Sequence, residues 1–197
     1  MDRDPNTVCI VLAGGLARRM GGGDKSLRLF EGRTLLDHVL DRVTTQVRAL
    51  ALNANGDPAR FAAWNLPVVA DPVPGHPGPL AGVLAGMRWA QAHHPGIPDV
   101  LSVPTDTPFL PRDLAERLRA GRGDRAIAVA VSDGQHYPVV ALWPVALANA
   151  LEAGLRAGAR RIDAWTAEHG IAAVEFDTEN GDPFFNVNRP EDLDRRK

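Results

Sequence analysis

Short apolar runs alternate with longer segments of helical period along this chain, and this alternation limits the possible folds more than any other feature. The apolar runs predict strands at residues 8–13, 49–53, 68–70, 100–103 and 171–176. The helical periodicity predicts helices at residues 34–47, 80–93, 111–119, 145–157 and 161–169, with short helical pieces at 59–64 and 190–195. Strands that alternate with helices are typical of a largely parallel sheet covered on both faces. We therefore expect an α/β fold with three layers, in which helices cover both faces of a mostly parallel Rossmann-like sheet.

The region after residue 125 is less regular. Residues 126–131 and 138–143 predict two strands across a turn that contains Asp133 and Gly134, which favours a hairpin. A chain of 197 residues with 45% hydrophobic residues can bury one substantial core. No segment has the composition of a linker, so we expect a single domain over residues 1–197.

Composition and charge exclude several classes of protein. The net charge of −2 gives no overall attraction to nucleic acid or to an anionic membrane. No apolar run approaches the length of a membrane span, and the first seven residues lack the features of a secretory signal. Cys9 is the single cysteine and lies in an apolar run, which favours a buried structural role. We expect a cytoplasmic protein that binds neither nucleic acid nor membrane.

A glycine-rich basic segment follows the first predicted strand. Residues 12–27, LAGGLARRMGGGDKSL, contain five glycines, two arginines and a lysine. Such a turn can offer backbone N–H groups and positive charge to a phosphate chain. Lys25 and Lys197 are the only two lysines in an arginine-rich chain, which favours a site for a compact ammonium group at Lys25. The alternative is a surface turn with a solvated lysine.

Two familiar phosphate-binding motifs do not fit this segment. A P-loop needs glycine directly before its lysine, but Asp24 precedes Lys25. The glycines also do not have the G-x-G-x-x-G spacing of a dinucleotide-binding turn. The long basic segment is better suited to wrapping a triphosphate.

Polar residues follow several of the predicted strands. Asn53, Asp71 and Asp106 come at or just after the ends of the second, third and fourth strands, as the glycine-rich segment does after the first. Each has a local alternative as a helix cap or a turn former. Because ligands bind at the carboxyl ends of strands in open α/β sheets, we expect these residues to converge on one ligand site.

Three motifs together resemble a known family. The opening LAGG, RMGG and DKSL, the later PTDTPFLP at 104–111 and FFNVNRPEDL at 184–193 are similar to bacterial molybdenum cofactor guanylyltransferases. The resemblance covers residues 8–193 and implies the fold of the nucleotide-diphospho-sugar transferases. It also implies an enzyme that transfers GMP from GTP to the terminal phosphate of molybdopterin with Mg²⁺ as cofactor. Residues 8–110 would form the nucleotide-binding half and 111–197 the pterin-binding half.

The resemblance also implies roles for individual residues. The nucleotide-binding positions are Leu12, Ala13, Gly14, Gly15, Lys25, Asn53, Asp71, Gly78, Gly82 and Asp106. The catalytic positions are Arg19, Lys25 and Asp106, of which Asp106 also matches the Mg²⁺ ligand. The pterin-binding positions are His136, Arg161, Asn186 and Asn188. Hairpin packing is the alternative for His136, and a solvated position near a helix end is the alternative for Arg161. A third glycine, Gly23, departs from the family pattern before Asp24.

The chemistry agrees with that resemblance. Nucleotidyl transfer needs positioned phosphates and neutralised charge but no covalent intermediate, and the sequence offers no convincing nucleophile–base pair. The expected partners are GTP and molybdopterin, with proteins that deliver molybdopterin or receive the product, and the expected state is a monomer. Alternatives within enzymes are a molybdopterin cytidylyltransferase and a sugar-phosphate nucleotidyltransferase. A nucleotide-binding regulatory protein is the alternative from another class.

Overall fold

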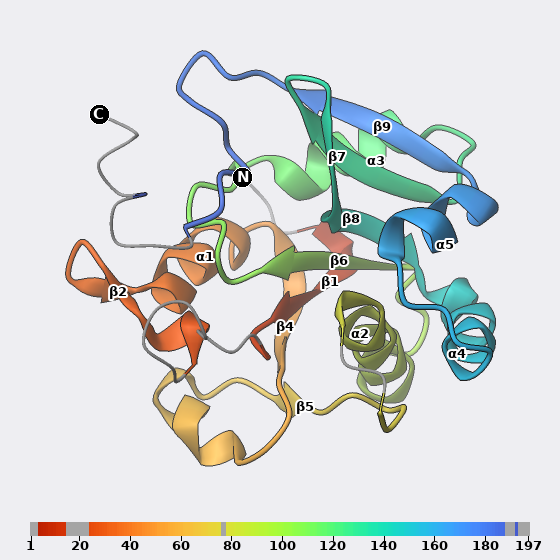
Figure 1. The fold of residues 1–197 in the computed structure, drawn as a ribbon, viewed down its shortest axis with the longest axis horizontal. Helices are drawn as coiled ribbons and strands as arrows, with labels where there is room; N and C mark the ends of the chain where they lie inside the picture. The colour runs from red at the N-terminus through yellow and green to blue at the C-terminus, as the bar shows by residue number, and fades with distance from the viewer. Residues whose placement is uncertain (1–3, 15–23, 76–77, 188–191, 193–197) are drawn as a thin grey trace.

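A seven-stranded sheet forms the centre of the molecule (Figure 1). The computed structural model describes residues 4–14, 24–75, 78–187 and 192. The strand order is β5-β4-β1-β6-β8-β7-β9. The strands are β1 (Asp4–Leu12), β4 (Val47–Asn53), β5 (Val68–Val69), β6 (Asp99–Pro104), β7 (Ile127–Ser132), β8 (Gln135–Pro144) and β9 (Ile171–Phe176). β8 pairs antiparallel with β6 and β7, and the other pairings in this sheet are parallel. The expected mostly parallel sheet and the hairpin after residue 125 are confirmed.

Helices cover both faces of the sheet. They are α1 (Leu35–Val43), α2 (Pro79–His93), α3 (Leu114–Arg122), α4 (Ala148–Arg156) and α5 (Ile162–His169), with the short 3-10 helices η2 (Lys25–Leu27), η3 (Pro58–Trp64) and η4 (Val145–Leu147). Residues of α1 and α3 share one core cluster, whereas residues of α2, α4 and α5 share another. The three layers are therefore confirmed. No described helix is both long and apolar enough to cross a membrane.

The central strand β1 is buried on both faces. Successive side chains of a strand point to opposite faces, and Cys9 and Val11 accordingly join the cluster of α1 and α3. Val8 and Ile10 join the cluster of α2, α4 and α5. This two-sided burial explains why β1 has a continuous apolar sequence.

The helix predicted at residues 34–47 ends earlier than expected. It ends at Val43, and Val47 begins β4. Gln46 lies between the two elements, and its side-chain amide donates to the carbonyls of Arg42 (2.7 Å) and Pro111 (2.8 Å). The Gln46 Oε1 also accepts from the backbone N–H of Ala115 at the start of α3 (2.9 Å). The turn between α1 and β4 is therefore tied to the start of α3.

Other differences from the sequence prediction are local. A small hairpin, β2 (Leu29–Phe30) with β3 (Arg33–Thr34), was not predicted. Its turn uses positive φ at Glu31 (47°) and Gly32 (80°), a conformation that suits a tight hairpin. The helix predicted from residue 111 begins at Leu114 instead. The predicted terminal helix at residues 190–195 lies outside the described residues except for residue 192.

Candidate active site

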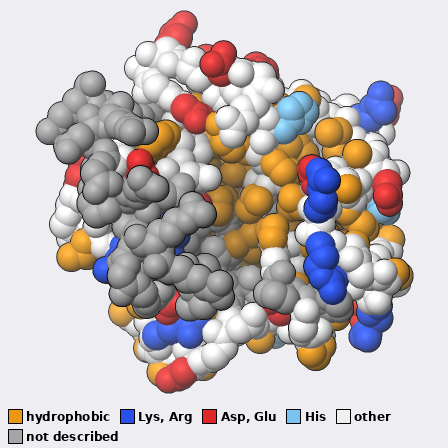
Figure 2. Space-filling view, viewed as in Figure 1, with side chains coloured by type: hydrophobic (Ala, Val, Ile, Leu, Met, Phe, Trp, Pro, Cys, Tyr) orange, Lys and Arg blue, Asp and Glu red, His pale blue; other side chains and the backbone are white. Residues whose placement is uncertain are grey.

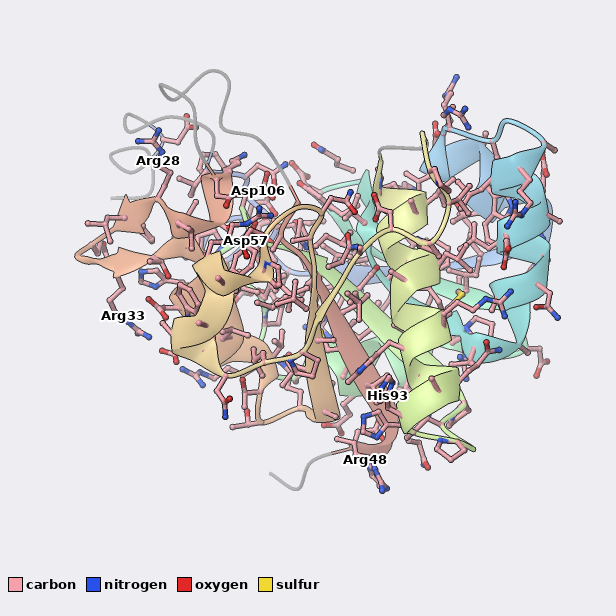
Figure 3. All side chains as sticks on the ribbon, turned by 90° about the horizontal axis from the view of Figure 1, so that it is seen from below. Arg28, Arg33, Arg48, Asp57, His93 and Asp106 are labelled. Atoms are coloured by element: carbon pink, nitrogen blue, oxygen red, sulfur yellow. The ribbon has the colours of Figure 1, made fainter. Side chains whose placement is uncertain are left out.

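The carboxyl ends of β1, β4, β5 and β6 meet at one edge of the sheet. Figure 3 shows Asp106, which follows β6, at the opposite end of the molecule from Arg48 near the start of β4 and His93 at the end of α2. A cavity of about 370 Å³ opens at this edge. Among its lining residues are the predicted residues Leu12, Gly14, Lys25, Asn53, Asp71, Gly78 and Asp106. The expected convergence of polar residues at this edge is therefore confirmed.

Lys25 and Asp106 form an ion pair in this cavity. The Lys25 Nζ lies 2.7 Å from Oδ2 of Asp106, and the side chains keep 14% and 21% of their exposure. The other carboxylate oxygen of Asp106, Oδ1, is buried and has no hydrogen-bond donor within the described part of the chain. A buried oxygen of this kind is costly unless a partner satisfies it. Asp106 therefore has an acceptor ready for a cation or another donor.

Few side chains of the described residues could bind a metal ion at this edge of the sheet. The described residues contain no group of three or more His, Cys, Asp or Glu side chains that could hold a metal ion. Mg²⁺ is commonly held by one or two carboxylates together with phosphate oxygens and water. Asp106 thus fits a metal site that is completed by a bound phosphate ligand.

Two asparagines hold the carboxylate of Asp71. Asn53 Nδ2 donates to Asp71 Oδ1 (2.9 Å), and Asn55 Nδ2 donates to Oδ2 (2.7 Å). The Asn55 Oδ1 accepts from the backbone N–H of Asp71 (2.9 Å). The sequence analysis did not select Asn55, although it also lines the cavity. The two-residue spacing from Asn53 could have indicated it, because residues two apart in an extended segment share a face.

Two predicted nucleotide-binding residues lie next to Asn53 and do not line the cavity themselves. Gly82 lies in α2 and is buried, and a Cβ at this position would lie 2.4 Å from Asn53 Oδ1. Ala13 is also buried, and its N–H donates to the carbonyl of Asn53 (2.9 Å). Neither residue is among those that line the cavity. Ala13 therefore holds the backbone of Asn53 by a hydrogen bond, and Gly82 leaves the space that the Asn53 side chain occupies.

The N-terminus of α2 faces the same cavity. Gly78 caps this 15-residue helix with φ of 148°, and Gly78 and Pro79 both line the cavity. The first N–H groups of a helix lack intrahelical partners and carry partial positive charge. This wall of the cavity is therefore suited to an anionic or polar ligand group.

The predicted pterin-binding residues lie in different places. His136 is exposed on β8, and Arg161 is exposed with its guanidinium 2.6 Å from Asp163. Neither is among the residues that line the cavity of Lys25 and Asp106. Asn186 is exposed, and the N–H of the next residue, Val187, donates to the carbonyl of Asp106 (2.8 Å). Gly15, Arg19, Gly23 and Asn188 lie outside the described residues.

Tyr137 and Asp182 hold the segment that carries Asn186. The Tyr137 hydroxyl donates to Asp182 Oδ2 (2.8 Å), and Asp182 Oδ1 accepts from the N–H of Phe184 (2.9 Å). Burial, together with the Asp182 carboxylate, raises the pKa of Tyr137, so the phenol stays a donor at neutral pH. The sequence analysis did not select either residue. The pair keeps residues 182–187 against the core through the fully buried Phe184.

Apolar surface adjoins this polar edge. The cavity lining includes Leu12, Pro79 and Val139 beside the charged residues. Figure 2 shows hydrophobic side chains in the middle of the face on which Figure 1 draws β6 and β8. Apolar walls with a few placed polar groups are typical of sites for small molecules with ring systems.

Comparison with known proteins identifies the family. The model of the MobA-like NTP transferase domain matches residues 9–173. This chain belongs to that family. Molybdenum cofactor guanylyltransferases from Rhodopseudomonas palustris (strain BisB5) and Nitrobacter hamburgensis are 56% and 52% identical to it over 192 residues. Each alignment covers 96% of this chain, and 91% and 92% of the two relatives. The family resemblance seen in the sequence is confirmed.

Solved structures support the same fold. The molybdopterin-guanine dinucleotide biosynthesis protein A of Archaeoglobus fulgidus has a TM-score of 0.71 to this chain, with 22% identity and 96% of each chain covered. A CMP:2-keto-3-deoxy-manno-octonic acid synthetase complexed with CTP has a TM-score of 0.70 at 12% identity, again with 96% of each chain covered. The nucleotide-diphospho-sugar transferase fold is thereby confirmed for this MobA-like protein.

Proposed function

We propose that this protein transfers GMP from GTP to the terminal phosphate of molybdopterin, giving molybdopterin guanine dinucleotide and pyrophosphate. The observation that carries the proposal is the cavity in which the Lys25–Asp106 pair lies with the Asn53–Asp71 pair. One pair provides a cation and a carboxylate for phosphates and metal, and the other provides polar groups for a nucleoside. The names of the relatives that are more than 50% identical support the same activity.

The reaction makes limited demands on the protein. An oxygen of the molybdopterin phosphate attacks the α-phosphorus of GTP, and the bond from that phosphorus to the bridging oxygen of the β-phosphate breaks. The attacking phosphate is already ionised near neutral pH, so no strong general base is needed. Catalysis then consists of alignment and of charge neutralisation on the leaving pyrophosphate. Lys25 supplies a fixed positive charge for this purpose, and Arg19 is proposed to supply another.

Asp106 is the proposed ligand of Mg²⁺. Its buried Oδ1 has no donor among the described residues, which supports a cation partner. The ion would neutralise phosphate charge when bound together with the nucleotide. Lys25, which contacts Oδ2 of the same carboxylate, is close enough to share the phosphate charge.

Asn53 and Asp71 are proposed to contact the nucleoside. The Asp71 carboxylate already accepts one amide hydrogen bond on each oxygen, and each oxygen has a further lone pair. A carboxylate or amide oxygen can accept from N1–H and the exocyclic amine of guanine, a donor pattern that cytosine lacks. This chemistry supports GTP over CTP.

Asn186 is the proposed residue on the acceptor side. The hydrogen bond from Val187 N–H to the Asp106 carbonyl supports this role, because it holds this segment beside Asp106. His136, Arg161 and Asn188 stay predictions for the pterin end.

Turnover with each of the four NTPs tests the proposed function. The protein is incubated with Mg²⁺, molybdopterin and one NTP, and the pterin product is identified by mass analysis. The expected product carries GMP, and chelation of the divalent cation is expected to stop its formation. Equal or better use of CTP would indicate the cytidylyl alternative, and a sugar phosphate as the preferred acceptor would indicate the sugar-nucleotide alternative. Nucleotide binding without any transfer would contradict an enzymatic role.

A further inference from the structure

Arg60 joins two segments at the edge of the candidate active site. Its Nε lies 2.8 Å from Oδ2 of Asp24, the residue directly before Lys25. Its Nη2 donates to the backbone carbonyl of Asn55 (2.6 Å), which follows β4. The contact with Asp24 is an ion pair without the alignment of a hydrogen bond. Arg60 itself is not among the residues that line the cavity.

The backbone that carries Arg60 is firmly anchored. Asp57 caps the start of η3 by accepting from Ala59 N–H (2.9 Å), and Figure 3 shows Asp57 on the same side of the molecule as Asp106. Phe61 is 1% exposed and belongs to the core cluster of α1 and α3. Trp64 Nε1 donates to Asp37 of α1 (2.8 Å). The guanidinium therefore extends from a fixed support toward Asp24.

The segment that Arg60 reaches is held to the rest of the molecule from Ser26 onward. Ser26 is buried, Leu27 packs against the core cluster of α1 and α3, and the Arg28 carbonyl accepts from Leu35 N–H (2.9 Å). Asp24 is the N-cap of the single turn η2, in which Leu27 N–H donates to the Asp24 carbonyl (3.3 Å) and Arg28 N–H to the Lys25 carbonyl (3.1 Å). A three-residue 3-10 helix adds little stability by itself. The ion pair to Asp24 adds an anchor on the other side, at the residue directly before the proposed phosphate-binding lysine.

The same ion pair also adjusts the charge of the site. The side chains of Arg60 and Asp24 keep 28% and 14% of their exposure, so water screens the pair less than it screens a surface pair. Without Arg60, the Asp24 carboxylate would lie uncompensated beside Lys25. Its negative charge would repel a triphosphate and attract the lysine ammonium.

We propose that Arg60 is a positioning residue for nucleotidyl transfer, acting through Asp24 to hold Lys25 in place opposite Asp106. This role rests on the proposed function. It predicts that Arg60 and Asp24 act as one unit, because each has its effect through the other.

A double-mutant cycle tests whether the two residues act as one unit. Arg60→Gln, Asp24→Asn and the double variant are compared with the wild type for kcat/KM with GTP at saturating molybdopterin and Mg²⁺. Each single variant is expected to lose about tenfold in kcat/KM, and the double variant is expected to be no worse than the poorer single variant. Arg60→Lys keeps the charge and is expected to retain more activity than Arg60→Gln. Arg33→Gln, which removes an exposed ion pair with Asp41, is the matched control and is expected to be silent.

Hydrogen exchange of residues 24–28 in the ligand-free protein gives a readout apart from activity. Both single variants are expected to exchange faster in this segment, whereas Arg33→Gln leaves it unchanged. Additive losses in the double variant would show that Arg60 acts independently of Asp24, and would overturn the positioning role. Unchanged exchange would also overturn it, even if kcat/KM falls. A wild type that does not use GTP would instead overturn the proposed function, and the role of Arg60 in it. Faster exchange in the variants would even then show that the ion pair between Arg60 and Asp24 holds this segment.

Discussion

Lys25 and Asp106 are 81 positions apart in the sequence, yet the lysine Nζ donates to the aspartate Oδ2 at 2.7 Å. The pair joins the segment after β1 to the segment after β6, which are the ends of neighbouring parallel strands. The lysine is the counter-ion of this carboxylate. A triphosphate and a metal ion would therefore meet a lysine and an aspartate that already lie together.

Removal of the Asp106 carboxylate is expected to abolish transfer. Asp106→Ala removes the proposed metal ligand, and the loss of that charge interaction corresponds to about 3 kcal/mol or more in the transition state, which is at least about a hundredfold in rate. The fold is expected to survive, because the buried Oδ1 satisfies no protein donor among the described residues. Steady-state kinetics and thermal unfolding measure the two effects, with Asp41→Ala at an exposed ion pair as control. Near-normal turnover of Asp106→Ala would contradict a role as metal ligand and would indicate that Asp106 is only structural.

Lys25 is expected to tolerate substitution poorly. Lys25→Ala should remove most activity, and Lys25→Arg should recover only part of it, because the planar guanidinium directs its hydrogen bonds differently. The kinetics of both variants with GTP test this expectation, and melting curves exclude unfolding. If both variants behave like the wild type, Lys25 is a solvated loop residue and the triphosphate site lies elsewhere.

Gly82 is expected to control the position of Asn53. In Gly82→Ala the new Cβ would lie 2.4 Å from Asn53 Oδ1 and 2.5 Å from Leu12 Cδ2, so Asn53 must move. Gly86→Ala is the matched control, because its Cβ would lie 2.7 Å from Ile10, away from the cavity. Both variants are expected to lose about 1–3 kcal/mol of stability through overpacking. Only Gly82→Ala should also raise the KM for GTP, because only this variant displaces Asn53. A similar KM for GTP in both variants would contradict the proposed contact of Asn53 with the nucleoside.

Asn55 is expected to matter through Asp71. Asn55→Ala removes the amide that holds Asp71 Oδ2 and the acceptor for the Asp71 N–H. We expect kcat/KM for GTP to fall about tenfold, since a charge-assisted hydrogen bond contributes roughly 1.5–3 kcal/mol. Asn55→Asp should be worse, because two adjacent carboxylates repel each other. Kinetics with GTP at constant pH measure both effects, and an Asn55→Asp variant with wild-type kinetics would contradict the expectation.

Asp37 is expected to stabilise the fold in a pH-dependent way. Burial raises the pKa of Asp37, but hydrogen bonds from Thr34 and Trp64 outweigh it and hold the pKa below the ordinary value of 3.8. A group whose pKa is lowered by folding stabilises the protein above its unfolded pKa and loses this effect as the pH falls through the folded pKa. Asp37→Ala, which breaks the capping box of α1, should therefore cost about 1 kcal/mol at neutral pH. Chemical unfolding from pH 7 to pH 3 should show the difference from wild type shrink below about pH 4; a constant difference would contradict it.

The architecture could be predicted from the sequence because the signals behind it are local. The apolar run at β1 and the helical period at α2 each depend on residues close together in the chain. Once parallel strands are assigned, their carboxyl ends must share an edge. The convergence of Lys25, Asn53 and Asp106 follows from that rule without any knowledge of side-chain contacts.

The residues missed from the sequence act through distant partners. Asn55 matters because it contacts Asp71, and Arg60 matters because it reaches Asp24. Gln46, at the end of the predicted helix 34–47, binds the start of α3. None of these partners is visible in a local pattern.

The sequence by itself determined the sheet with its covering helices, the family and the edge at which the polar residues meet, since periodicity and strand direction are properties of short segments. Only the tertiary structure decided which groups at that edge contact one another, because hydrogen bonds and ion pairs form over a few ångströms between segments far apart in the chain. Lys25 opposite Asp106, and Gly82 behind Asn53, are the two contacts that show this difference most directly.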